Sequence, residues 1–546
     1  MRRTLSLALL PFAASAFLTI GNAWAAEEGS WPNFGGDLGN THNAEDEISI
    51  SPSTAGSLAV KWIYETAPEG EFADVSVPPA LADGVLYFPD WAGNLHAVDA
   101  ESGTEIWSRS LAEISGGEIL LSRNTPAIMG DTLILGSQID FAVFNLTGAR
   151  MMAVDRATGD KVWSAQVGDH PWSIITQSPV VVGNRLVVGV SSVEEVAASF
   201  PGYPCCNFIG SVVALNANDG AMMWQTFMAP GATPLPGRDP AGYSGNSVWG
   251  GMPTVDVESD TVFIVTGNNY HVPPDVLDCQ QDKLDGVKPP EFECDAPDNY
   301  VNSFVAVDLK NGKIKWAAKL GGFDAWNVAC GGIPGFPENP ENCPDPAGPD
   351  FDYGEGTMII DTTIGGEPRK LVVAGQKSGI FWAVDAGTGE LVWQTATGPG
   401  GLTGGMIWGS ATDGERIYVA NSNSAKIKYK LVNKTKGSKG QTTGGIWSAL
   451  DAATGEILWQ NADPTGSTDT GSVTVANGVV FLGSFEAGMM RALDAATGQQ
   501  LWEFSTDGAF VNGSPTVSDG VVYWGAGYSR GAPVGGTNKF WAFEVD

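Results

Sequence analysis

Six cysteines are the residues of this chain whose chemistry is most open to analysis from residue type and spacing. They form three pairs of near neighbours: Cys205 with Cys206, Cys279 with Cys294, and Cys330 with Cys343. An even number of thiols in an exported chain predicts disulfides, and the last two pairs are spaced as local ones. The adjacent pair fits a bond between neighbours, bonds to other cysteines, or ligation of a metal. No C-x-x-C-H sequence occurs, so the sequence offers no site for covalent c-type haem.

The amino-terminal segment, residues 1–25, predicts export. Arg2 and Arg3 begin it, a short apolar stretch follows, and Ala23-Trp24-Ala25 has the form of a cleavage site. The apolar stretch is short for a membrane span, and no later segment is long enough to be one. We therefore expect a signal peptide, a mature chain that begins at Ala26, and a periplasmic protein.

The chain is strongly acidic. It has 29 Lys and Arg against 62 Asp and Glu, a net charge of −33. Such a surface repels phosphate backbones and anionic headgroups, which argues against nucleic acid or a membrane surface as partner and favours cations, neutral substrates or a basic electron-transfer partner. One segment departs from this, the lysine-rich KIKYKLVNKTKGSKG (426–440). We expect it to be an exposed hairpin or loop, or alternatively a docking patch.

A repeated pattern, apolar-Asp-Ala-x-x-Gly-x-x-apolar-Trp, organises the rest of the chain. Its seven copies are AVDAESGTEIW (97–107), AVDRATGDKVW (153–163), ALNANDGAMMW (214–224), AVDLKNGKIKW (306–316), AVDAGTGELVW (383–393), ALDAATGEILW (449–459) and ALDAATGQQLW (492–502). An eighth copy is divided between LAVKWIYE near the start, which carries Trp62, and FWAFEVD at the end.

Each copy predicts a β-hairpin. An apolar strand ends at the Asp, whose side chain caps the turn, the Gly supplies positive φ, and the next strand carries the Trp. A further pair of apolar runs precedes most copies, so one repeat holds four strands, as a β-propeller blade does. Residues 26–546 are therefore expected to form one all-β, eight-bladed propeller in which the repeated tryptophans pack between blades. Pairing of FWAFEVD with the strand around Val60–Tyr64 would close the ring and remove its open edges.

Several segments between the repeats resemble those of PQQ-dependent quinoprotein alcohol dehydrogenases. They are WPNFGGDLGNTHNA, LLSRNTPAIMGDTLILG, TQSPVVVGNRLVVGVSSVEE, SVWGGMPTVDVESDTVFIVTGNNY and GQKSGIFWAVD. The resemblance covers essentially all of the mature chain and implies an eight-bladed enzyme that oxidises an alcohol with PQQ and Ca²⁺. The repeat alone would not imply an enzyme, because the same units build a non-catalytic scaffold of the outer-membrane assembly machinery.

The resemblance assigns roles to individual residues. For PQQ it implies Arg123 on a carboxylate, Thr176, Ser247 in place of a Thr, Trp249 as the stacking floor, Trp408, Lys377 on the reactive quinone oxygens, and Cys205 with Cys206 as a roof. For calcium it implies Asn268 and Glu194, with Glu195 as the rival. These residue types suit the chemistry, because three carboxylates need cationic and hydroxyl partners, a flat tricycle needs an aromatic floor, and a hard cation prefers oxygen ligands.

Two features depart from the family pattern. The family's catalytic Asp ends a D-x-W-D sequence, where this chain has Asp324-Ala325-Trp326-Asn327. An amide cannot accept the substrate's proton, so we expect Asp324 to act as the base and to adjoin the metal, with Glu195 as the alternative. The adjacent cysteines also follow the Glu194 segment instead of preceding the arginine. Ala329 stands where lanthanide-dependent members carry an acid, which favours calcium.

Other segments indicate the substrate. DWAGNLHAVDAESG, PGYPCCNFIGSVVALNA, GQKSGIFWAVD and ILWQNADP are similar to the quinoprotein domain of polyvinyl-alcohol dehydrogenases, which implies secondary and polymeric alcohols. Without a haem motif in the sequence, we expect a separate cytochrome c to accept the electrons. Two alternatives stay open, a non-catalytic propeller that binds another protein and a PQQ enzyme for sugars or aldehydes.

Overall fold

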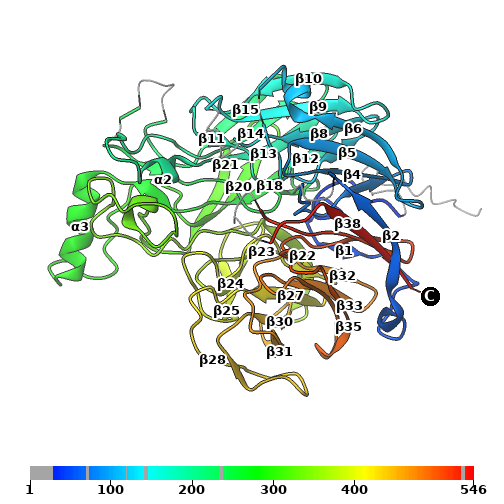
Figure 1. The fold of residues 1–546 in the computed structure, drawn as a ribbon. Coiled ribbons are helices and arrows are strands. Elements are labelled where there is room, and N and C mark those ends of the chain that lie inside the picture. The colour runs from blue at the N-terminus through cyan, green and yellow to red at the C-terminus, as the bar shows by residue number, and fades with distance from the viewer. Residues whose placement is uncertain are drawn as a thin grey trace, which may run out of the picture.

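The computed structural model is a ring of eight four-stranded antiparallel sheets, the all-β propeller that the repeats predict (Figure 1). It describes residues 29–68, 73–118, 120–139, 146–232, 238–239, 241–529 and 535–545. The expected signal peptide, residues 1–25, lies outside the described residues. Within the described ranges no helix combines the length and the apolar character needed to cross a bilayer.

The first four blades follow one another in the chain. Their strands are β3 (Ala80–Ala82), β4 (Val85–Pro89), β5 (Asn94–Asp99) and β6 (Glu105–Ser110); β7 (Ala127–Met129), β8 (Thr132–Gly136), β9 (Arg150–Asp155) and β10 (Lys161–Gln166); β12 (Val180–Val182), β13 (Arg185–Ser192), β14 (Ser211–Asn216) and β15 (Met222–Phe227); and β17 (Thr254–Asp256), β18 (Thr261–Val265), β20 (Ser303–Asp308) and β21 (Ile314–Lys319).

The other four blades continue in the same order. They comprise β22 (Met358–Ile364), β23 (Glu367–Gly375), β24 (Ile380–Asp385) and β25 (Leu391–Ala396); β26 (Ala411–Thr412), β27 (Arg416–Asn421), β30 (Ile446–Asp451) and β31 (Ile457–Ala462); β32 (Thr474–Ala476), β33 (Val479–Ser484), β34 (Met489–Asp494) and β35 (Gln500–Ser505); and β36 (Thr516–Ser518), β37 (Val521–Gly525), β38 (Lys539–Glu544) and β2 (Ala59–Glu65).

Short strands, helices and turns lie outside the four-stranded order of the blades. They are β1 (Asn43–Ala44), β11 (Ser173–Ile174), β16 (Ser244–Gly245), β19 (Asn269–His271), β28 (Tyr429–Lys430), β29 (Gln441–Thr442), α1 (Leu111–Ser115), α2 (Glu194–Ala197), α3 (Pro274–Leu284) and the single 3₁₀ turns Ala55–Ser57 and Val328–Cys330. The lysine-rich segment contains β28 and β29, which pair as a hairpin, as expected.

The ring closes through strands from opposite ends of the chain. β2 pairs antiparallel with β38, with Val60 opposite Phe543 and Tyr64 opposite Phe540. The predicted joint between FWAFEVD and the first repeat is therefore confirmed. Because β38 is hydrogen-bonded on both sides, the carboxy-terminal strand is not an open edge of this blade.

The repeated tryptophans link each blade to the next. Their indole Nε1–H groups donate to carbonyl oxygens in the neighbouring blade: Trp62 to Ala100, Trp107 to Arg156, Trp163 to Ala217, Trp224 to Leu309, Trp316 to Ala386, Trp393 to Ala452, Trp459 to Ala495 and Trp502 to Leu58. In seven of these joints the repeat's glycine lies directly on the preceding tryptophan, as Gly455 does on Trp393. The repeat therefore encodes both the hairpin and the contact between blades.

The connections that join second to third strands, and one blade to the next, all emerge at the same end of the ring. The long insertions lie there, including α2, α3 and the three disulfides Cys205–Cys206, Cys279–Cys294 and Cys330–Cys343. The two expected local disulfides are thus confirmed, and the adjacent cysteines bond to each other. Among the described residues no cysteine is free.

Candidate active site

A cavity of about 540 Å³ opens at this loop-bearing end of the ring. Connecting loops within and between blades contribute to its wall: Trp91 from β4–β5, Arg123 from β6–β7, Glu195 from β13–β14, Trp249 from β15–β17 and Asp352 from β21–β22. Thr176, Ser247 and Tyr270 also line it. The cavity therefore brings together residues that lie more than 250 positions apart.

Trp249 forms part of the wall and is fixed on several sides. Its indole N–H donates to Asp352 Oδ2 at 3.0 Å, and its ring meets Trp408 edge-to-face with centroids 5.7 Å apart. The Thr176 hydroxyl donates to the Trp249 carbonyl at 2.9 Å, which holds the backbone there. An indole held in this way offers a flat, preorganised surface for an aromatic ligand.

Arg123 and Gln138 bring hydrogen-bond donors to the cavity. The Arg123 guanidinium lies 4.5 Å from the centre of the Trp408 ring and donates to the Tyr528 hydroxyl at 2.6 Å. Arg123 Nε and Gln138 Nε2 are buried and have no hydrogen-bond partner among the described residues. A buried donor without a partner costs about 1–3 kcal/mol, so these groups favour a ligand that accepts hydrogen bonds. Gln138 was not among the residues expected from the sequence.

Ser247 lies in the cavity wall, where its side chain has a hydrogen-bond partner. Its hydroxyl is buried and shares a 2.7 Å hydrogen bond with the Tyr270 hydroxyl, which in turn donates to the Ser192 carbonyl. These residues all line the cavity. Ser247 therefore already has a protein partner, although it stays within reach of the space that a ligand would fill.

Lys377 lies under Trp249 in a cluster of carboxylates. Its Nζ lies 3.0 Å from Asp350 Oδ2, 3.4 Å from Asp352 Oδ2 and 5.6 Å from the centre of the Trp249 ring. Burial alone would lower the pKa of Lys377, but the charges of Asp350, Asp352 and Glu195 raise it above its usual value. Burial also raises the pKa of Asp350, with only partial relief from Lys377. The site thus holds a permanent ammonium among three acids.

Glu195 lines the polar side of the cavity, and Asn268 lies behind it against Asp352. Burial and the charge of Asp352 raise the pKa of Glu195 to about 7, against the effect of Lys377. The Asn268 backbone N–H donates to Asp352 Oδ1 at 2.6 Å, and its side-chain Nδ2 donates to the Trp326 carbonyl at 2.7 Å. Because Nδ2 of Asn268 is already hydrogen-bonded, Oδ1 is the side-chain atom that is left to bind a ligand.

Glu194, the other candidate from the same segment, does not line this cavity. Its carboxylate accepts hydrogen bonds from the Tyr203 hydroxyl at 2.9 Å and from the backbone N–H groups of Asn207 and Phe208 at 3.0 and 2.8 Å. His170 Nε2 lies 3.4 Å away and, together with these donors, lowers the pKa of Glu194 despite its burial. Glu194 therefore anchors the loop that carries the adjacent cysteines.

Asp324, expected as the base, is likewise saturated by protein contacts. Its carboxylate accepts the backbone N–H groups of Asp350 and Phe351 at 2.8 and 2.6 Å and the Asn302 side chain at 2.8 Å. Burial, partly opposed by these bonds, raises its pKa to about 6. The geometry makes Asp324 a support for the loop that presents Asp350 and Asp352.

The Cys205–Cys206 disulfide lies close to the cavity wall without being part of it. Cys206 is buried in a cluster with Phe208 and Tyr270, and Asn327 Nδ2 donates to Cys205 Sγ at 3.8 Å. Tyr270 is the residue that separates this cluster from the cavity. The disulfide therefore stiffens the wall behind Tyr270, and the expected roof over a cofactor stays a prediction.

Sequence reasoning missed Asp350 and Asp352. They stand on either side of Phe351 near the end of a long proline- and glycine-rich loop, a few residues before β22. Carboxylates that alternate with aromatic residues shortly before a strand are a recognisable signal, and GPDFDYGEG carries it.

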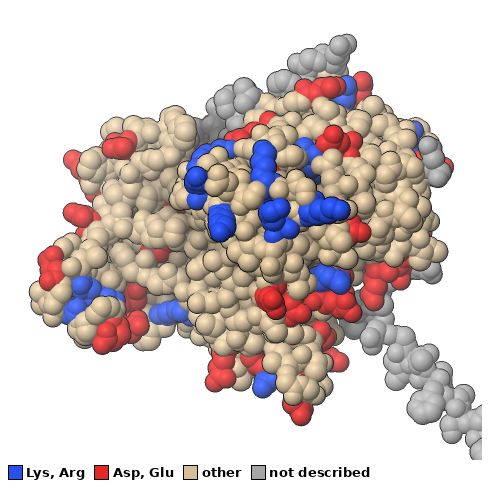
Figure 2. Space-filling model, turned by 90° about the horizontal axis from the view of Figure 1, so that it is seen from below, with Lys and Arg blue, Asp and Glu red and all other residues tan. Residues whose placement is uncertain are grey.

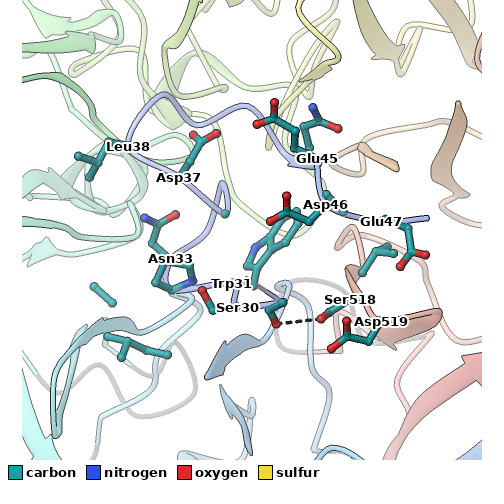
Figure 3. A pocket seen from close by; sticks show the side chains of 18 of the residues that line it. Ser30, Trp31, Asn33, Asp37, Leu38, Glu45, Asp46, Glu47, Ser518 and Asp519 are labelled. Atoms are coloured by element: carbon teal, nitrogen blue, oxygen red, sulfur yellow. Dashed lines mark hydrogen bonds between the residues drawn. The ribbon is translucent and has the colours of Figure 1, made fainter. Parts of the chain in front are cut away.

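A second cavity of about 540 Å³ lies at the other ends of the inner strands, against the amino-terminal segment (Figure 3). Acidic side chains dominate its polar lining: Asp37, Glu45, Asp46, Glu47 and Asp519. It contains neither lysine nor arginine. A tricarboxylate would be repelled there, so charge alone favours the first cavity as the cofactor site.

Comparisons with known proteins agree with this architecture. A family model described as the glucose/ethanol/alcohol dehydrogenase β-propeller domain, named PQQ, matches residues 31–335, and the model of outer membrane protein assembly factor BamB matches residues 442–546. Proteins called polyvinylalcohol dehydrogenase from Pseudomonas sp and Sphingopyxis sp. are 26% and 29% identical, over 91% and 90% of this chain and 73% and 72% of their own.

A solved structure shows the same fold. The quinohemoprotein alcohol dehydrogenase of Comamonas testosteroni superposes with a TM-score of 0.68 at 20% identity, covering 96% of this chain and 81% of its own. The first family model matches more than half of the chain. The chain therefore belongs to the glucose/ethanol/alcohol dehydrogenase β-propeller family, the PQQ-type quinoprotein oxidoreductases.

Proposed function

We propose that this chain is a periplasmic, PQQ- and calcium-dependent dehydrogenase that oxidises secondary alcohols, including polymers such as polyvinyl alcohol, to ketones and passes the electrons to a separate cytochrome c. The observation that carries the proposal is one cavity whose wall combines the Trp249 indole, two residues with unpaired donors, and the acids Glu195 and Asp352 that neighbour Lys377. The two relatives called polyvinylalcohol dehydrogenase support the substrate class, and the expected signal peptide supports the location.

The residues fit PQQ. A planar tricarboxylate needs an aromatic surface and donors at its edge, and Trp249 supplies the surface. Arg123 and Gln138 supply buried donors that lack partners, and Thr176 adds a hydroxyl on the same wall. Trp408 lies beneath the Arg123 guanidinium and fixes its direction. Lys377, on the side of the carboxylate cluster, would contact the reactive quinone oxygens.

The residues also fit a calcium ion. Three acids, Glu195, Asp350 and Asp352, surround one ammonium, so the site carries excess negative charge when they are ionised. A divalent cation with oxygen ligands would offset this charge, and Glu195 with Asn268 Oδ1 offers such ligands. Of the two rival glutamates the geometry favours Glu195, because the bonds that Glu194 accepts already satisfy its carboxylate.

When bound, PQQ supplies the two-electron acceptor and calcium the Lewis acid that polarises it. The chain's own part is to place the alcohol and accept its hydroxyl proton. We assign the role of base to Asp352 instead of Asp324, because Asp352 is part of the cavity wall and Asp324 is not. Asn268 and Trp249 hold the Asp352 carboxylate in place. Oxidation of one alcohol carbon to a carbonyl releases two electrons and two protons, so two one-electron acceptors are needed per turnover.

The test is reconstitution of the purified chain with PQQ and Ca²⁺, followed by dye reduction with pentane-2,4-diol, polyvinyl alcohol, glucose and acetaldehyde. We expect the secondary alcohols to be oxidised fastest. Glucose or acetaldehyde as the better substrate would assign a different substrate class. Failure to bind PQQ, read from quenching of tryptophan fluorescence, would favour the non-catalytic propeller.

A matched pair of variants tests the base. Asp352→Asn should lower the rate of substrate-driven PQQ reduction by roughly 10²–10⁴-fold while PQQ stays bound. Asp324→Asn should lower it less than Asp352→Asn does, because Asp324 acts only through the loop. If Asp324→Asn lowers the rate more than Asp352→Asn does, the base is Asp324 and not Asp352.

A further inference from the structure

The lysine-rich segment forms the most basic surface feature of an otherwise acidic chain. Residues 426–440 contain six of the 29 basic residues and none of the 62 acids. All six are exposed: Lys426, Lys428, Lys430, Lys434, Lys436 and Lys439. Figure 2 shows basic side chains gathered on the face seen from below, the side on which β28 lies in Figure 1.

Most of this charge is not neutralised within the chain. Lys426 pairs with Glu486 at 3.3 Å, and Lys439 donates to the Pro464 carbonyl. For Lys428, Lys430, Lys434 and Lys436, the described part of the chain provides no carboxylate within ion-pair distance. Four unpaired ammonium groups on one hairpin therefore produce a locally positive potential, although the net charge of the whole chain is −33.

The base of the hairpin stands at the same end of the ring as the active site, and residues 432–435 then run back along the outer strand β31 on the flank of the blade. The hairpin connects β27 to β30, the second and third strands of its blade, just as the loops that carry Glu195 and Lys377 do in theirs. Its base is also bonded to the Lys377 loop. The Ser424 hydroxyl donates to the Gly404 carbonyl at 2.8 Å, Gly404 N–H to Gly401, and Gly401 N–H to the Lys377 carbonyl.

We propose that this hairpin is the docking surface for an acidic electron-accepting protein. The inference rests on the proposed oxidation, which releases two electrons that must leave one at a time. An acidic protein would be repelled by most of this surface, so the lysine hairpin would direct it to the flank of this blade, where the base of the hairpin adjoins the active-site end of the ring. An acidic partner is the opposite of the basic one that net charge alone favours, because the local charge near the site differs in sign from the total.

The experiment compares two charge reversals in the loaded enzyme. Lys434→Glu/Lys436→Glu changes the hairpin. Lys161→Glu/Lys313→Glu makes the same change in charge at two exposed lysines that follow hairpin turns at the opposite end of the ring. Each is assayed with an alcohol and three acceptors: an acidic c-type cytochrome, a basic c-type cytochrome, and an uncharged soluble quinone.

We expect the hairpin reversal to lower kcat/KM for the acidic cytochrome by roughly ten-fold or more at low salt, with the quinone rate unchanged. The control reversal should leave both rates unchanged. For the unaltered enzyme, the rate with the acidic cytochrome should fall as salt is raised, because screening shortens the reach of the lysine charges to about 10 Å at 0.1 M.

Several outcomes would overturn the inference. An acidic-cytochrome rate that neither salt nor the hairpin reversal changes would show that the partner docks elsewhere, as would a preference for the basic cytochrome. Loss of the quinone rate in the hairpin variant would show that the hairpin supports the cavity itself. Loss of binding only to phosphatidylglycerol vesicles or dextran sulfate would assign the surface to a lipid or a polyanion. Absence of any alcohol-dependent quinone reduction in the unaltered enzyme would instead refute the proposed function.

Discussion

Gly455→Ala tests whether the repeat's glycine is required by the contact between blades or only by its turn. Gly455 has φ of +71°, and a Cβ built there would lie 2.7 Å from Trp393 Cδ2 and 2.7 Å from Thr395 Oγ1. Trp393 is buried and its indole N–H is bonded to the Ala452 carbonyl, so the ring cannot turn away without losing that bond. Gly84 is a matched control, because its φ is +72° and no heavy atom lies within 4 Å of the added Cβ.

The two variants separate backbone strain from crowding. An L residue in the left-handed region costs about 1–2 kcal/mol, which both variants share. Overpacking adds about 1–3 kcal/mol at Gly455 alone. We therefore expect the free energy of unfolding to fall by about 1–2 kcal/mol for Gly84→Ala and by about 2–5 kcal/mol for Gly455→Ala.

The assay is urea unfolding followed by tryptophan fluorescence, with all variants at one protein concentration. In a double variant that also carries Trp393→Leu, the change Gly455→Ala should lower the free energy of unfolding by less than it does when Trp393 is present, because the smaller side chain makes room for the methyl group. Equal losses at Gly84 and Gly455, or no recovery in the double variant, would refute the idea that the glycine is kept for the contact between blades.

Three further predictions concern buried acids and the cavity floor. Burial raises the pKa of Glu355 from 4.5 to about 7, so protonated Glu355 contributes about 3 kcal/mol of stability that is complete below pH 4.5 and is lost as the pH rises through 7. In Glu355→Gln, the free energy of unfolding measured with urea should therefore decline less steeply between these pH values. A slope equal to that of the unaltered protein would contradict this. Glu195→Gln should raise the calcium concentration needed for activity, whereas Glu194→Gln should lower stability and leave the calcium requirement unaltered; a titration that gives the opposite pattern would restore Glu194 as the ligand. Trp249→Ala should weaken PQQ binding, measured by equilibrium dialysis, with little change in the unfolding midpoint, and unfolding without selective loss of PQQ would make Trp249 a core residue.

The sequence by itself determined the fold, because its signals are local. Each of the seven intact copies contains the Asp (Asn216 in one copy) that caps a turn, the Gly that allows positive φ and the Trp that reaches the next blade. Counting those tryptophans gives the number of blades, and the divided eighth copy gives the closing joint between β2 and β38. The two disulfides between cysteines close in sequence could be predicted for the same reason.

Only the tertiary structure decided which acids face the cavity. Glu194 and Glu195 are adjacent on α2, where successive side chains point about 100° apart, so only the helix's placement turns one inward and the other toward the cysteine loop. Asp324 and Asp352 lie on one long connection whose path the sequence pattern does not specify. The path is fixed by contacts distant in sequence, such as the hydrogen bonds that Asp352 accepts from Trp249 and Lys377, and these form only once the neighbouring blades have packed together.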